Sequence, residues 1–130
     1  MQKPKSYRDL IVWQRAVELI DEIDAIMERL TPLQRFWLGG QIYRAALSIS
    51  SNIAEGHDHD YSAVYLRRLA DAKGSTREVE SQLLVIQRRK NMAPNETKTA
   101  LAMTDEIGRM LRSLTRRVRA RAQSESIPNT

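Results

Sequence analysis

Apolar residues recur at spacings of three and four throughout residues 31–56, the pattern of one long helix. They form two neighbouring stripes. The first stripe consists of Phe36, Gly40, Tyr43, Leu47, Ser50 and Ala54, and the second of Leu38, Ile42, Ala45, Ile49 and Ile53. Two adjacent stripes predict burial over a wide arc, so we expect the other segments of the chain to pack around this helix.

Both ends of this helix carry local signals. Thr31 is the predicted N-cap, Pro32 occupies the first helical position, and Gln34 three residues after the cap completes a capping box. Gly56 is expected to end the helix in the left-handed conformation, which glycine adopts without steric cost.

Residues 7–30 show the same helical spacing, with Ser6 as predicted N-cap and Asp9 near the positive end of the helix dipole. One apolar row is Leu10, Trp13, Val17, Ile20, Met27 and Leu30, and the second is Val12, Ala16, Leu19, Ile23 and Ile26. Only Thr31 and Pro32 separate this helix from the next, which predicts an antiparallel hairpin.

A third helix is predicted over residues 60–91, capped by Asp58 or Asp60. Its apolar seam has coiled-coil spacing and consists of Tyr61, Tyr65, Leu69, Ala72, Thr76, Val79, Leu83 and Ile86. Gly74 lies in mid-helix, where glycine costs about 1 kcal/mol relative to alanine. This cost indicates that another backbone passes close to Gly74.

Pro94 opens a predicted fourth helix over residues 94–122, followed by a frayed tail over 123–130. Its apolar side consists of Leu101, Ile107, Leu111, Leu114 and Val118, with Met103 and Met110 alongside. Similar helix lengths and short links predict an all-α, up-down-up-down antiparallel four-helix bundle, a single domain over residues 1–130.

The composition is that of a globular helical protein with an uneven charge. Cysteine is absent, which excludes disulfides and thiolate chemistry. Neither a signal peptide nor an apolar run of membrane-spanning length is present, so we expect a cytoplasmic protein. Residues 1–56 are balanced in charge, and the whole formal excess of +5 lies in the second half.

The strongest candidate for chemistry is a cluster of arginines at the end of the fourth helix. Six arginines and no acid lie between Ile107 and Gln123: Arg109, Arg112, Arg116, Arg117, Arg119 and Arg121. Four of them (109, 112, 116 and 119) fall within an arc of roughly 80° and form a continuous ridge. Guanidinium groups bind phosphate well, which favours contact with RNA or DNA, whereas a solvated helix end that complements the dipole is the structural alternative.

Two weaker signals accompany it. The run His57-Asp58-His59-Asp60 has metal-ligand residue types, but adjacent side chains on a loop diverge, so we expect a polar connection and no metal. A polar row on the second helix consists of Gln41, Arg44, Ser48, Asn52 and Glu55, ending at Gly56. Small and amide side chains favour a hydrogen-bonded seam between helices or subunits, in which Arg44 could pair with an acid; ligand contact and catalysis are the alternatives.

No catalytic constellation accompanies these residues, so we expect neither enzymatic activity nor a cofactor. The apolar faces of the first two helices are wider than one bundle interior needs. Since exposed patches of that size are rare on soluble monomers, the excess predicts self-association.

Several strings resemble one family. They are Tyr7-Arg8-Asp9-Leu10, Val12-Trp13-Gln14, Ala16, Leu38, Gln41-Ile42, Arg44-Ala45-Ala46, Ser48-Ile49, Ser51-Asn52-Ile53-Ala54-Glu55-Gly56, Leu69-Ala70, Gly74-Ser75 and Glu78. They resemble the bacterial four helix bundle protein family, encoded by intervening sequences within large-subunit rRNA genes. The resemblance covers about residues 7–118, and the fourth helix matches least.

The resemblance implies a left-handed antiparallel bundle that assembles as a ring-shaped homopentamer. The family is similar to the accessory variability determinant of diversity-generating retroelements, a basic pentamer that binds the reverse transcriptase and nucleic acid. It implies no enzymatic activity and assigns no catalytic role to the polar row.

Three functions therefore compete. The preferred hypothesis is a non-catalytic homo-oligomeric scaffold whose arginine surfaces hold RNA or DNA phosphates. The alternative is a protein–protein adaptor, for example for a reverse transcriptase or another nucleic-acid enzyme. The third is an enzyme or small-ligand binder that uses the polar row of residues 41–55.

Overall fold

The computed structural model describes residues 4–90 and 92–126 of the 130-residue chain. The elements are a short 3-10 helix η1 (Tyr7–Asp9) and the helices α1 (Ile11–Met27), α2 (Pro32–His57), α3 (Ser62–Arg89) and α4 (Pro94–Ser126). No strand occurs in these described ranges. The all-helical prediction is confirmed. No helix in this part of the chain is long and apolar enough to span a membrane.

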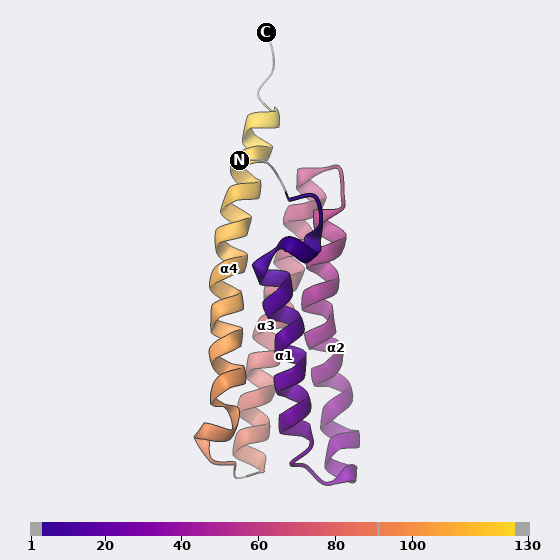
Figure 1. The fold of residues 1–130 in the computed structure, drawn as a ribbon, viewed down its shortest axis with the longest axis vertical. Helices are drawn as coiled ribbons and strands as arrows, with labels where there is room; N and C mark the ends of the chain where they lie inside the picture. The colour runs from indigo at the N-terminus through magenta and orange to yellow at the C-terminus, as the bar shows by residue number, and fades with distance from the viewer. Residues whose placement is uncertain (1–3, 91, 127–130) are drawn as a thin grey trace.

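The four long helices run alternately up and down along one axis, and α4 returns beside α1 (Figure 1). Each helix packs against its neighbours in the chain, and α1 also packs against α4. Among the described residues, no Cα atom of α1 lies within 8 Å of one in α3, and none of α2 lies within 8 Å of one in α4. The helices thus form a four-membered ring around one core, the predicted up-down-up-down bundle.

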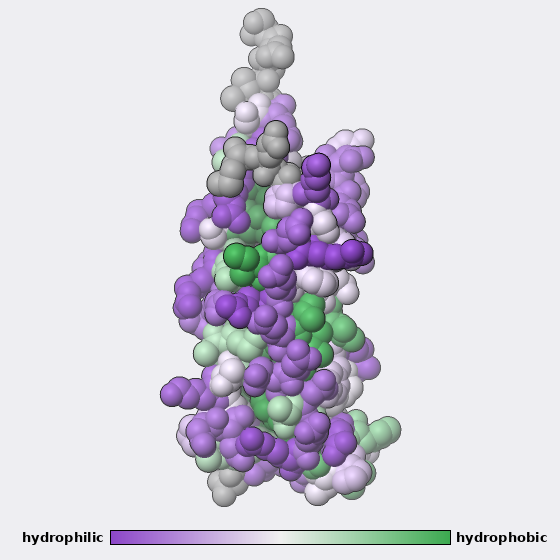
Figure 2. Space-filling model, in the orientation of Figure 1, coloured by the Kyte–Doolittle hydropathy of each residue, from purple (hydrophilic) through white to green (hydrophobic). Residues whose placement is uncertain are grey.

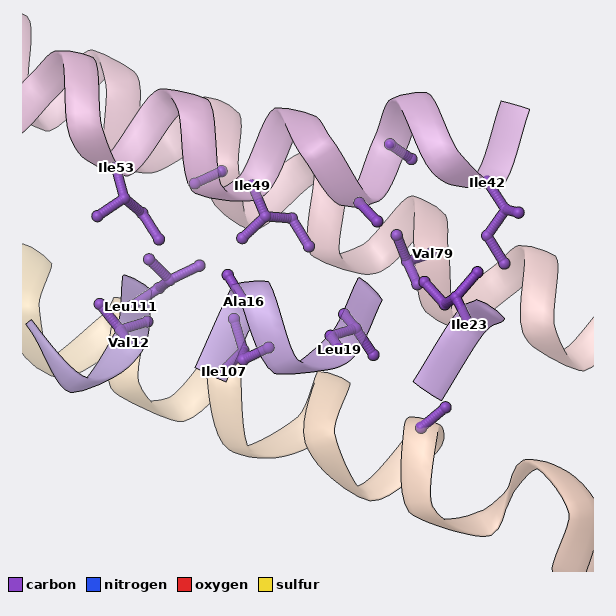
Figure 3. Packing of buried hydrophobic residues seen from close by; sticks show 14 of the residues in the cluster. Val12, Ala16, Leu19, Ile23, Ile42, Ile49, Ile53, Val79, Ile107 and Leu111 are labelled. Atoms are coloured by element: carbon purple, nitrogen blue, oxygen red, sulfur yellow. The ribbon is translucent and has the colours of Figure 1, made fainter. Parts of the chain in front are cut away.

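The core consists of residues from the predicted apolar rows. On α1, Ala16, Leu19 and Ile23 are completely buried, and they face α2, α3 and α4 at the centre of the bundle (Figure 3). On α3, every seam residue from Tyr65 to Ile86 is buried, whereas Tyr61 is 69% exposed. Helical spacing alone therefore selected the buried seam of α3. On α1 it predicted two apolar rows; the row from Val12 to Ile26 is buried, and the other row includes Val17, which is 36% exposed.

The start of the first helix differs from the prediction. Ser6 accepts a hydrogen bond from the backbone N–H of Arg8 (3.1 Å), but it caps η1 and not a long helix. Leu10 is extended (φ −74°, ψ 124°), so α1 begins only at Ile11. The break lets Leu10 bury its side chain while Tyr7 packs edge-on against Trp13, with ring centroids 5.2 Å apart.

The N-terminus of α2 is as predicted and its C-terminus is not. Thr31 and Gln34 form the capping box, because each backbone N–H donates to the other residue's side-chain oxygen. The helix continues through Gly56 to His57, and its C-cap Asp58 is right-handed. Gly56 is needed for space: an added Cβ would lie 2.7 Å from Tyr65 Cδ1 and 3.0 Å from Arg68 Cβ.

Two expectations about α3 are wrong. Its N-cap is Tyr61, without a side-chain hydrogen bond, and neither Asp58 nor Asp60 caps it. Gly74 is exposed, and a Cβ added there would meet nothing within 4 Å. No other backbone in the described part of the chain passes close to Gly74.

The fourth helix is longer than predicted. It continues past residue 122 to Ser126, and Ser62 Oγ donates a hydrogen bond to Glu125 Oε2 (2.9 Å). That bond joins the last turn of α4 to the first turn of α3. Residues 123–126 of the expected tail are therefore helical, and residues 127–130 lie outside the described ranges.

Candidate functional site

The predicted arginine ridge lies on the outward side of α4. Arg109, Arg112, Arg116 and Arg119 are all exposed, while Ile107, Leu111, Leu114 and Val118 on the opposite side are buried. From Arg109 to Arg119 the ridge is about 15 Å long at 1.5 Å per residue. We call these four residues the arginine ridge.

The charges of the ridge are largely uncompensated. Arg109 pairs with Asp105 one turn earlier on the same helix. In the described part of the chain, Arg112, Arg116 and Arg119 have no acidic group within ion-pairing distance. Three free guanidinium groups along one exposed line are a surface that an anion can approach without displacing a protein carboxylate.

The other two arginines of the cluster point elsewhere. Arg117 lines a mainly apolar cavity of about 330 Å³ between the start of α1 and α4. Arg121 is half-buried and lines a polar cavity of about 250 Å³ beside Tyr65. Burial raises the pKa of Tyr65 to about 12, and the positive charges of Arg121 and Arg117 oppose that rise. The structure thus separates the four residues of the arginine ridge from Arg117 and Arg121, which line cavities.

The two histidines of the 57–60 run diverge. His57 is the last residue of α2, is buried, and meets Tyr65 edge-on with ring centroids 6.1 Å apart. His59 is exposed and its Nδ1 accepts a hydrogen bond from the backbone N–H of Tyr61 (3.2 Å). No group of three or more metal-ligating side chains occurs among the residues that the structure describes.

The polar row of α2 lies along the junction with α3. Asn52 Nδ2 donates to the backbone oxygen of Ser48 (2.8 Å) and to Ser48 Oγ (3.0 Å). Ser75 on α3 donates to Ser48 Oγ (2.9 Å), which bridges the two helices. At the end of the row, Glu55 Oε2 lies 3.6 Å from Arg68 Nε of α3. Ser48 and Asn52 therefore belong to a hydrogen-bonded seam.

The first two members of the row line an open groove instead. The groove has a volume of about 430 Å³ and is lined by Gln41, Arg44, Ala45, Ser48, Ser75 and Glu78. Within the described ranges Arg44 has no ion-pair partner, although Glu78 lines the same groove. The pairing expected for Arg44 is absent from this structure.

Sequence reasoning missed the α3 wall of the groove. Polar residues on α3 repeat at spacings of three and four, matching the row on α2: Arg68, Asp71, Ser75, Glu78 and Gln82. This second polar stripe was visible in the sequence. Which helix it faced was not, because that depends on how α2 and α3 are rotated against each other.

Large apolar side chains remain exposed on α2. Leu33, Phe36 and Trp37 are 67%, 76% and 70% exposed near its start, and Leu47 is 52% exposed two to three turns later. Figure 2 shows apolar side chains among the polar ones over α1 and α2. We call Leu33, Phe36, Trp37 and Leu47 the apolar stripe. The predicted burial of both apolar rows of this helix is wrong for the single chain, because Phe36 and Leu47 of the first row are exposed.

Fold and surfaces together define an antiparallel four-helix bundle that presents a cationic ridge, a polar groove and an apolar stripe. Comparison with family models then identifies the chain. The family model described as 23S rRNA-intervening sequence protein matches residues 8–113, and the chain belongs to this family. No curated protein matches it. The matched region includes Arg109 and Arg112 and ends before Arg116 and Arg119, so the second half of the ridge lies beyond it.

Proposed function

We propose that this protein is a non-catalytic, homo-oligomeric bundle of the cytoplasm that holds RNA or DNA by the phosphate backbone. The observation that carries the proposal is the arginine ridge, in which Arg112, Arg116 and Arg119 are exposed and unpaired in the described structure. The family description, which refers to 23S rRNA, supports a nucleic-acid setting.

The chemistry of the ridge favours binding without sequence preference. Guanidinium groups form bidentate, charge-assisted hydrogen bonds with phosphate oxygens. Such contacts position a protein on nucleic acid, whereas reading a sequence needs side chains directed at base edges. The ridge consists of arginines along one line, so each contact adds to the affinity for phosphate and distinguishes little between nucleotide sequences.

Self-association is supported by the apolar stripe. Phe36 and Trp37 pack edge-on against each other (ring centroids 5.7 Å apart) and both remain exposed on the single chain. Burying such rings against a second copy would remove a large apolar area from water. Several copies would bring several ridges onto one strand and raise affinity by avidity. The number of copies, five, and the left-handed sense of the bundle rest on the family resemblance.

The binding test compares two variants of equal charge. Arg112, Arg116 and Arg119 are changed to Glu in the first. The control changes Arg67, Arg88 and Arg89 to Glu; these are exposed residues of α3. Each variant lowers the formal net charge from +5 to −1, since every Arg→Glu change removes two charges. Only the position of the lost charge differs.

Binding is measured by fluorescence anisotropy with mixed-sequence RNA and DNA over a salt series. Three phosphate contacts predict that affinity falls about 40-fold between 50 and 200 mM salt. The ridge variant should lose this slope of affinity against salt concentration. The control should keep most of the slope. Equal losses in both variants, or a parent affinity that does not depend on salt, would contradict binding at the ridge.

Self-association has its own matched pair. Light scattering should show the parent as a multiple of 15.0 kDa, and Phe36→Ser with Trp37→Ser should lower that mass. The control is Leu84→Ser with Val85→Ser, two residues of α3 that are about half exposed. A parent that is monomeric at micromolar concentration would refute the oligomer.

A protein adaptor is the second candidate, because the same apolar stripe would suit a different protein. A monomeric parent that co-purifies with one stoichiometric protein partner, and loses it when Phe36 and Trp37 are changed to Ser, would favour the adaptor.

A further inference from the structure

Small side chains line part of the groove between α2 and α3. Ala45 and Ser48 of α2 and Ser75 of α3 border an open volume of about 430 Å³. This volume falls within the range of small-molecule sites, and the lining is mostly polar.

Opposite charges stand on the two walls of this groove. Arg44 of α2 and Glu78 of α3 both line it, yet they form no ion pair with each other. The Arg44 guanidinium lies back along its own helix, with Nη1 3.8 Å from the position that a Cβ on Gly40 would occupy. Among the described residues, the Glu78 carboxylate receives one contact, a long one from Gln82 Nε2 (3.5 Å). Both charges are available to a ligand.

The hydroxyl groups at the base supply a further donor. Ser48 Oγ accepts hydrogen bonds from Asn52 Nδ2 and from Ser75 Oγ. A serine hydroxyl has two acceptor positions and one hydrogen to donate, so both acceptor positions of Ser48 are filled and its O–H remains to be donated. If Ser48 is instead the donor in the bond between the two serines, the O–H of Ser75 is left without an acceptor. Either way the groove holds one unused hydroxyl donor.

We propose that this groove binds a small zwitterion, a molecule with a carboxylate and an ammonium group such as a free α-amino acid. The carboxylate would pair with Arg44 and accept the unused hydroxyl hydrogen, and the ammonium group would pair with Glu78. A phosphate would be repelled by Glu78, and a metal ion would find one carboxylate beside a fixed cation. The proposal is independent of nucleic-acid binding, because the arginine ridge is on a different helix.

The test is titration of the full-length protein with free L-amino acids, followed by the backbone amide NMR signals of Ser48 and Ser75. Acetate and glycine methyl ester serve as probes that carry only one of the two charges. At least one amino acid should shift both signals saturably below about 10 mM, and each single-charge probe should bind at least about tenfold more weakly.

The variants Arg44→Gln and Glu78→Gln each remove one charge, and both positions are exposed, so the fold should remain intact. Each should weaken binding at least about tenfold, whereas Arg67→Gln on the outer side of α3 should leave it unchanged. Nucleic-acid affinity should be unchanged in Arg44→Gln, which separates this result from failure of the ridge. The proposal is overturned if no amino acid shifts the groove signals, if acetate binds as tightly as the amino acids, or if both charge variants retain full affinity. A second copy of the chain that covers the groove at Ser48 and Ser75 would also overturn it.

Discussion

The contact between α2 and α3 at Gly56 allows a quantitative test of the fold. In Gly56→Ala the new Cβ would lie 2.7 Å from Tyr65 Cδ1, 3.3 Å from Tyr65 Cε1 and 3.0 Å from Arg68 Cβ. Tyr65 is buried, so its ring has little room to move, and Arg68 Cβ is attached directly to the α3 backbone. The helices must therefore separate locally to accept the methyl group.

The net effect is the difference between two terms. Overpacking lowers the free energy of unfolding by about 1–3 kcal/mol, and replacing a helical glycine by alanine raises it by about 1 kcal/mol. We expect Gly56→Ala to lower the free energy of unfolding by about 1 kcal/mol, or about 4 °C in Tm for a chain of this size.

Gly74→Ala is the matched control, because it makes the same change in mid-helix where a Cβ meets nothing within 4 Å. It should raise the free energy of unfolding by up to about 1 kcal/mol.

Both variants are measured by urea and thermal unfolding at one fixed protein concentration, since self-association makes Tm concentration-dependent. A Gly56→Ala protein that gains as much stability as Gly74→Ala would refute the close approach of α2 to Tyr65. If Gly74→Ala instead lowers both stability and the mass by light scattering, a second copy of the chain contacts α3 at that point.

Other measurements probe the seam, the capping box and two tyrosine side chains, the buried Tyr65 and the partly buried Tyr43. Asn52→Ala removes two hydrogen bonds to Ser48 and should cost about 1–2 kcal/mol in urea unfolding, whereas Glu55→Ala breaks only an exposed 3.6 Å ion pair and should change little. Thr31→Ala should cost about 1 kcal/mol by the same assay, because it opens the capping box of α2. Burial raises the pKa of Tyr65 to about 12, and burial with the hydrogen bond to Asp24 raises the pKa of Tyr43 to about 12. Since both phenols ionise more readily in the unfolded chain (near 10), their contribution to stability is complete below pH 10 and is lost as pH rises from about 10 to 12. The urea unfolding midpoint, followed by phenolate absorbance, should decrease across that pH range. A midpoint that does not change with pH would show that neither phenol has a raised pKa in the folded chain.

The sequence predicted the elements well because the information for a helix is local. Three-and-four spacing identified the buried seam of α3, and the pair Thr31 and Gln34 identified the start of α2. Spacing also placed Arg112, Arg116 and Arg119 on one side of α4. Each of these features depends on residues within one or two turns of the same helix.

Only the tertiary structure decided how the helices are positioned against one another. The sequence predicted a close neighbour at Gly74 and a helix end at Gly56, yet Gly56 lies against Tyr65 and Gly74 faces open space. Likewise, Ser48 meets Ser75 while Arg44 stays unpaired across from Glu78. These outcomes depend on how far α2 and α3 slide and rotate against each other. That register is set by the packing of core side chains far apart in the chain, so no local pattern contains it.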